Sequence, residues 1–172
     1  MRGNAVVVIA VLLSGCADTH SLVRTAGTGV QKLDPTRTVY VSVSEDGRYG
    51  SGNYPGSGQM AAQIVAGAFS KIALRVQTGV GAEPLERTME SAKKVGATYL
   101  VVPTILHWEH RRTEWSGIPN QSSIKISVVD VVSGQTLDGA VITAKSGLAT
   151  FGGDTPQGLL PEPVEKFVSS LY

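Results

Sequence analysis

The sequence contains one cysteine, Cys16, among 172 residues, so no intramolecular disulfide can form. An excess of charge of either sign is also missing, because the sequence has 15 Lys and Arg residues and 14 Asp and Glu residues. No long run of Lys or Arg is present either. A nearly neutral chain without a basic cluster lacks the electrostatic footprint of nucleic-acid binding. We therefore expect no nucleic-acid partner.

Hydrophobic runs long enough to cross a bilayer are absent as well. The apolar run near the amino terminus, Ala5–Leu13, has nine residues, which is too few to span a membrane. It follows the basic Arg2 and precedes the small residues Ser14 and Gly15. This order is typical of a signal peptide.

The residues around the cysteine, Leu13-Ser14-Gly15-Cys16, resemble the lipobox of bacterial lipoprotein precursors. The resemblance implies cleavage before Cys16 and its acylation, for example with palmitate, which anchors the protein to a membrane. By resemblance to enterobacterial lipoproteins, Ala17 at the next position, in place of Asp, implies the outer membrane and a domain that faces the periplasm. The alternative is a secreted chain with an incidental cysteine. We accordingly divide the chain into a signal peptide (1–15), the lipidated Cys16 with a flexible tether (16–36), and a periplasmic domain (37–172).

Hydrophobic periodicity within that domain predicts an α+β fold. Alternating apolar residues indicate strands, and apolar residues at three- and four-residue spacing indicate helices. The expected order is β-α-β-α-β-β-β-α, a single mixed sheet with the helices packed on one face. Ser57 is the expected N-cap of the first helix, and Pro103 indicates an edge or a bulge in its strand. The expected strands are 38–44, 74–78, 99–107, 124–132 and 137–145, and the expected helices begin near residues 57, 84 and 160.

A glycine-rich stretch, residues 49–59, joins the first strand to the first helix. Loops of this kind hold phosphates in nucleotide-binding folds. Here Pro55 occupies the place of the third glycine of a dinucleotide motif, no lysine is near, and no acidic residue ends the second strand. We therefore expect a surface loop and no nucleotide. Tyr49 and Tyr54 in this loop, with Trp115 in a later one, form the candidate surface for a partner or ligand.

Catalytic and metal-binding patterns are incomplete. The histidines of His107-Trp108-Glu109-His110 point to opposite faces of a predicted strand, so we expect no metal site. Ser91-x-x-Lys94 and Lys145-Ser146-Gly147 match two motifs of penicillin-binding enzymes, but the Ser-x-Asn motif between them is missing. We predict that the protein is not an enzyme and needs no cofactor.

Four segments, 39–50, 98–120, 124–142 and 150–172, resemble a family of proteobacterial lipoproteins, frequent in pseudomonads, that has no assigned function. His110 and Thr155 depart from that family's pattern. The strand–helix–strand and hairpin order is more distantly similar to curli-secretion and exopolysaccharide-export lipoproteins. It is also similar to outer-membrane activators of peptidoglycan synthases and to the amino-terminal domain of the Tol translocation protein. These resemblances imply an assembly or protein-binding module of the envelope, with an envelope protein or a second copy as partner. The alternative is a lipoprotein that binds a small ligand or a glycan.

Overall fold

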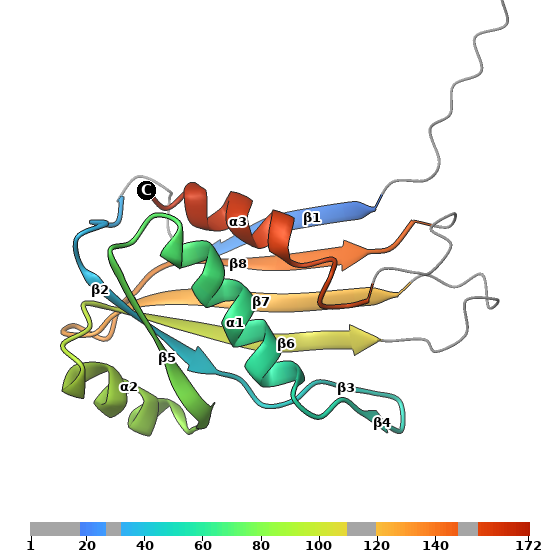
Figure 1. The fold of residues 1–172 in the computed structure, drawn as a ribbon, viewed down its shortest axis with the longest axis horizontal. Coiled ribbons are helices and arrows are strands. Elements are labelled where there is room, and N and C mark those ends of the chain that lie inside the picture. The colour runs from blue at the N-terminus through green and yellow to red at the C-terminus, as the bar shows by residue number, and fades with distance from the viewer. Residues whose placement is uncertain (1–17, 27–31, 110–119, 148–154) are drawn as a thin grey trace, which may run out of the picture.

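The computed structural model describes residues 18–26, 32–109, 120–147 and 155–172 (Figure 1). Within them the chain forms eight strands and three helices. Their bounds are β1 Thr19–Ala26, β2 Thr38–Val43, β3 Arg48–Tyr49, β4 Gly52–Asn53, α1 Ser57–Ser70, β5 Arg75–Ala82, α2 Leu85–Lys94, β6 Tyr99–Glu109, β7 Gln121–Asp130, β8 Thr136–Lys145 and α3 Pro161–Ser169.

Six strands form one mixed sheet in the order β1-β8-β7-β6-β2-β5. The strands β2, β5 and β6 are parallel to one another, whereas β6, β7, β8 and β1 pair antiparallel. This arrangement confirms the predicted α+β fold with a single mixed sheet.

The first strand of this sheet was not expected from the sequence. Residues Thr19–Ala26, assigned to a flexible tether, form β1 and pair with β8 from Thr19↔Lys145 to Ala26↔Gly139. The Arg24 guanidinium forms an ion pair with Asp138 and donates to the Ser170 hydroxyl at 2.6 Å. The same guanidinium lies 5.8 Å from the centre of the Phe167 ring. These contacts, absent from the local sequence pattern, hold the strand to β8 of the sheet and to α3.

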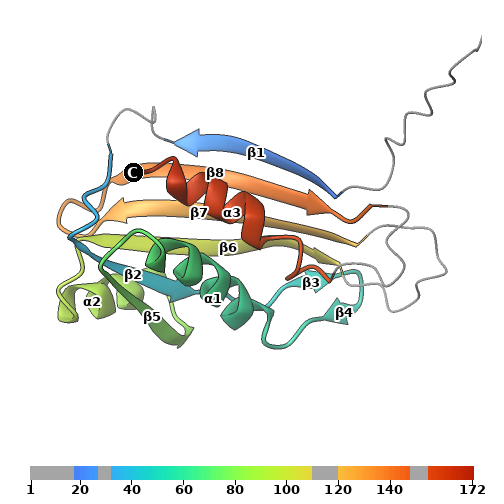
Figure 2. The ribbon, with the colours of Figure 1, turned by 45° about the horizontal axis from the view of Figure 1, so that its top comes forward.

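The main core lies between one face of the sheet and the helices α1 and α3, which run side by side over it (Figure 2). The alternating Val39, Val41 and Val43 of β2 face this core, as the sequence pattern predicts. Phe69 of α1 and Phe167 of α3 are fully buried in it. Burial of each of these side chains contributes on the order of 2 to 3 kcal/mol. This core holds many more buried apolar residues than the opposite face, so it supplies most of the hydrophobic stabilisation.

The helix α2 departs from the predicted placement of all helices on one face. Tyr40 and Leu100 point away from the main core and form a second cluster with Ala92 of α2 and with Val129 and Val131. The helix α2 therefore covers the opposite face, near the turn between β7 and β8. The physical reason is the connectivity: β5 and β6 lie on opposite sides of β2, and right-handed crossovers to opposite sides place their helices on opposite faces.

Candidate functional site

The glycine-rich stretch forms a small ribbon, with β3 paired to β4, followed directly by α1. Gly50 and Gly56 have φ angles of 56° and 85°, which side-chain-bearing residues adopt only at a cost. The N-cap of α1 is Gly56, so the prediction of Ser57 as N-cap is wrong by one residue. The Ser57 hydroxyl instead accepts from the Gly47 amide at 2.8 Å.

The amides at the start of α1 are bound by a carboxylate of the chain itself. Asp46 Oδ1 accepts from the Gly58 amide at 2.9 Å, and its Oδ2 accepts from the Gly56 amide at 3.1 Å. A negative charge at this position satisfies unpaired donors and interacts favourably with the helix dipole. The place where a phosphate would bind is thus occupied by Asp46, which the motif in residues 49–59 could not reveal because Asp46 precedes it in the sequence.

Gly58 allows two backbone segments to approach each other closely. A Cβ atom at this position would lie 2.1 Å from the Ser44 carbonyl oxygen, so the end of β2 and the start of α1 can be this close only with glycine between them. Together with Asp46, this contact holds residues 44–46 against the helix. The glycines of the loop therefore serve local packing and turns.

A cleft opens where β2 separates from β6. Their pairing ends at Val41↔Val101, and the Ser42 hydroxyl donates to the Val101 carbonyl at 3.3 Å where the two strands part. The cleft has a volume of about 820 Å³, within the size range of small-molecule pockets. It lies at the carboxyl ends of β2 and β5, where the order of the parallel strands reverses, the position at which open α/β sheets bind ligands.

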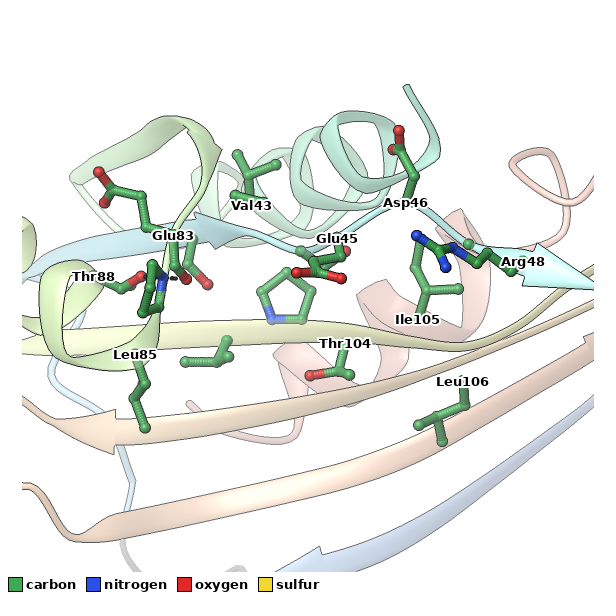
Figure 3. A pocket seen from close by; sticks show the side chains of 17 residues that line it. Val43, Glu45, Asp46, Arg48, Glu83, Leu85, Thr88, Thr104, Ile105 and Leu106 are labelled. Atoms are coloured by element: carbon green, nitrogen blue, oxygen red, sulfur yellow. Dashed lines mark hydrogen bonds between the residues drawn. The ribbon is translucent and has the colours of Figure 1, made fainter. Parts of the chain in front are cut away.

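The cleft is lined by apolar side chains and by charges of both signs (Figure 3). Glu45 and Arg48 form no ion pair within the described part of the chain, while the Glu83 carboxylate accepts from the Ser91 hydroxyl at 3.3 Å. Two exposed leucines, Leu85 and Leu106, border it. Carboxylates, a guanidinium and hydroxyl groups beside apolar walls suit a polar ligand that carries an amine or several hydroxyls. The labelled lining residues are Val43, Glu45, Asp46, Arg48, Glu83, Leu85, Thr88, Thr104, Ile105 and Leu106.

The predicted aromatic surface is only partly described. Tyr49 is 42% exposed and its ring lies edge-on to His107, with the ring centres 4.7 Å apart. Tyr54 is partly buried against the main core, so the structure does not bring it together with Tyr49 into one exposed patch. Trp115 and Cys16 lie outside the described residues.

The residues of the incomplete chemical motifs that the structure describes lie apart from one another or form single contacts. His107 Nε2 lies 3.1 Å from Glu109 Oε2, and His110 is outside the described residues. Among residues 18–26, 32–109, 120–147 and 155–172, no group of three or more His, Cys, Asp or Glu side chains could hold a metal ion. Ser91 belongs to α2 beside the β7–β8 turn, whereas Lys145 ends β8 at the far end of the sheet.

No helix within the described ranges is both long and apolar enough to cross a membrane.

Comparison with known proteins identifies a family but no activity. Residues 31–171 match a family model described as Domain of unknown function (DUF4823). No curated protein matches the sequence.

Solved structures with the same fold include two of the PelC dodecamer from Paraburkholderia phytofirmans, one of them of a point variant. Both are 17% identical to this chain, and both matches cover 89% of it. The match to the variant covers 98% of the variant's chain and has a TM-score of 0.68. The match to the other structure covers 97% of that chain and has a TM-score of 0.64. The lipoprotein GNA1162 from Neisseria meningitidis is 14% identical over 79% of this chain and 95% of its own, with a TM-score of 0.47.

Proposed function

The chain belongs to the DUF4823 family of unknown function, and we propose that it is a lipoprotein of the cell envelope whose role is to form protein assemblies. Acylated Cys16 holds it to the outer membrane, and the domain in the periplasm binds protein, including further copies of itself. It carries out no reaction. The order of basic residue, apolar run and Leu-Ser-Gly-Cys supports the anchor.

The observation that carries the assembly role is the edge strand β5. It pairs with β2 on one side only, and within the described residues its other side presents backbone donors and acceptors, with an irregularity between Thr78 and Ala82 where its register against β2 shifts. Val80 in this strand is 99% exposed, and Leu74 just before it is 74% exposed. Edge strands of monomeric proteins are normally blunted by charges, prolines or bulges, because an open edge pairs with other chains. In β5 no proline occurs and only Arg75, at its first position, carries a charge, so the irregularity between Thr78 and Ala82 is the one such device beyond its first residue.

The similarity to PelC supports self-association, because PelC forms a dodecamer and shares the fold over most of both chains. The edges β1 and β5 lie at opposite sides of one sheet, so a contact between them is head-to-tail. Repeated head-to-tail contacts close into a ring when the rotation between copies allows it.

Light scattering of the full-length acylated protein in detergent tests the assembly. We expect a mass several times that of one chain, and a lower mass for Val80→Asp, which places a charge on the open edge. Val132→Asp is the matched control, because Val132 is 90% exposed on the β7–β8 turn, away from both edges. A monomer for the unsubstituted chain, with no partner captured by crosslinking from Val80, would contradict the proposal.

A second function, binding of a small ligand or a glycan, is favoured by the cleft between β2 and β6. A ligand that binds only the folded state raises the melting temperature, so a thermal-shift screen with amines, amino sugars and oligosaccharides tests it. Thr104→Trp fills the cleft and is expected to abolish any shift. If a ligand raises the melting temperature of Thr104→Trp as much as that of the unsubstituted chain, the ligand binds outside the cleft.

A further inference from the structure

The length of chain between the acylated cysteine and the sheet decides how the domain sits at the membrane. Only Ala17 separates Cys16 from Asp18, so the Cα atoms of Cys16 and Asp18 lie within about 7 Å of each other in any conformation. Asp18 is itself attached to the domain, because its Oδ1 accepts from the Gly147 amide at 2.9 Å. The strand β1 begins at the next residue.

The contacts of β1 prevent this strand from detaching from the sheet, which would lengthen the connection to Cys16. The strand pairs with β8 along its length, and the Arg24–Asp138 ion pair fastens it near its other end. Asp138 is 4% exposed, and leaving such a carboxylate without its cation costs several kcal/mol. Release of β1 as a free tether is therefore strongly disfavoured.

From this geometry we propose that the protein docks end-on against the lipid surface, with the end of the sheet where β1 begins facing the bilayer. The proposal rests on the proposed acylation of Cys16. The facing end, which we call the anchor end, comprises Asp18 and Thr19, the last residues of β8 and β6, and the β3–β4 ribbon (Figures 1 and 2).

The chemistry of the anchor end fits a membrane surface. Lys145 and Arg48 are exposed there, and neither forms an ion pair within the described part of the chain. Exposed cations are attracted to lipid phosphates. Tyr49 lies at the same end and is 42% exposed, and tyrosine side chains are enriched at the level of lipid headgroups. The predicted partner residue Tyr49 is thus assigned to the lipid side.

The opposite end of the sheet then faces away from the membrane. The strand β7 has ten residues, so at about 3.3 Å per residue the β7–β8 turn lies roughly 30 Å farther from the lipid. In this orientation the edges β1 and β5 face sideways along the bilayer, toward neighbouring copies anchored in the same way. End-on docking and edge-to-edge assembly are therefore compatible.

Fluorescence quenching by headgroup-labelled lipids tests the orientation. Because the only native cysteine is Cys16, a second cysteine introduced into the acylated chain is the one thiol available for a dye. The dye is placed at Tyr49→Cys and Lys145→Cys on the anchor end, and at Val132→Cys on the β7–β8 turn as the control. The protein is reconstituted in vesicles of phosphatidylethanolamine and phosphatidylglycerol that contain nitroxide-headgroup lipids.

We expect quenching several-fold stronger at positions 49 and 145 than at 132. Insertion of twelve Gly and Ser residues between Ala17 and Asp18 adds a flexible reach of roughly 20 Å, so the three values are expected to converge. Equal quenching at both ends without the insertion, or stronger quenching at 132, would overturn the proposal.

A separate control distinguishes this inference from the anchor itself. The Cys16→Ser variant is expected to be released, so that it is no longer found in the membrane fraction of cells. If Cys16→Ser stays membrane-bound, the proposed anchor is wrong. If Cys16→Ser is released while the acylated chain shows equal quenching at both ends, the anchor stands and only the end-on orientation fails.

Discussion

The same substitution at two positions of α1 should have opposite effects on stability. Replacing a helical glycine by alanine ordinarily stabilises a protein by about 0.5 to 1 kcal/mol. Gly67 is exposed, and a Cβ there meets nothing within 4 Å, so Gly67→Ala is expected to show this gain. Gly58 lies in the same helix, but its Cβ would lie 2.1 Å from the Ser44 carbonyl oxygen.

The size of the effect at Gly58 follows from that contact. An ordinary carbon–oxygen separation is about 3.3 Å, so the helix start and the end of β2 would have to move apart by about 1 Å. That movement disturbs the hydrogen bonds from Gly56 and Gly58 to Asp46. Forcing extra volume into a packed site costs typically about 1 to 3 kcal/mol. We therefore expect Gly58→Ala to be less stable than the unsubstituted chain.

Urea unfolding at 25 °C, followed by circular dichroism, measures both variants in a Cys16→Ser background that avoids acylation. At comparable slopes, the midpoint should rise for Gly67→Ala and fall for Gly58→Ala. In thermal scans the two variants should differ by several degrees, since about 1 kcal/mol corresponds to roughly 2 to 4 °C for a domain of this size. If Gly58→Ala is as stable as Gly67→Ala, the close approach inferred between Ser44 and the helix is wrong.

Three further outcomes test other contacts. Asp46→Ala should lose about 1 to 2 kcal/mol of unfolding free energy in urea, because it removes the acceptor of the helix amides, whereas the neighbouring Glu45→Ala should change it by less than about 0.5 kcal/mol. Burial raises the pKa of Tyr172 to about 12 from 10.0, so the contribution of the buried hydroxyl to stability is complete below pH 10 and is lost as the pH rises toward 12. Urea unfolding midpoints should therefore fall less steeply between pH 10 and pH 12 for Tyr172→Phe than for the unsubstituted chain. Hydrogen bonds from the Ser133 amide and hydroxyl lower the pKa of Asp130 below 3.8, so stability falls as the pH drops below that value, and Ser133→Ala should weaken this acid dependence; identical acid titrations for both proteins would contradict it.

Much of the fold could be predicted because its elements carry local periodicity. The alternation in β2, β7 and β8 and the helical spacing in α1 and α3 each reflect one buried face, and the structure places those faces in the core. Pro103 was also informative: β6 pairs with β2 only up to Val101, so the proline lies where that side of the strand is open. The sequence could not reveal β1, whose residues are mostly exposed and therefore show no apolar period.

The candidate sites were less predictable, because they depend on contacts between segments distant in the sequence. The cleft is made by residues 42–48, 82–85, 88 and 102–106, and no local motif links these segments. Tyr49 and Tyr54 were grouped by their proximity in sequence, but one is exposed beside His107 and the other packs on the core.

The sequence by itself determined the single cysteine with its lipobox-like context, the balance of charge and the order of the longer elements from β2 to α3, because these follow from residue identity and local periodicity. Only the tertiary structure decided which face each helix covers, which carboxylate binds the start of α1 and that the sheet begins at Thr19. These depend on connectivity and on pairings such as Arg24 with Asp138, which join residues more than a hundred positions apart.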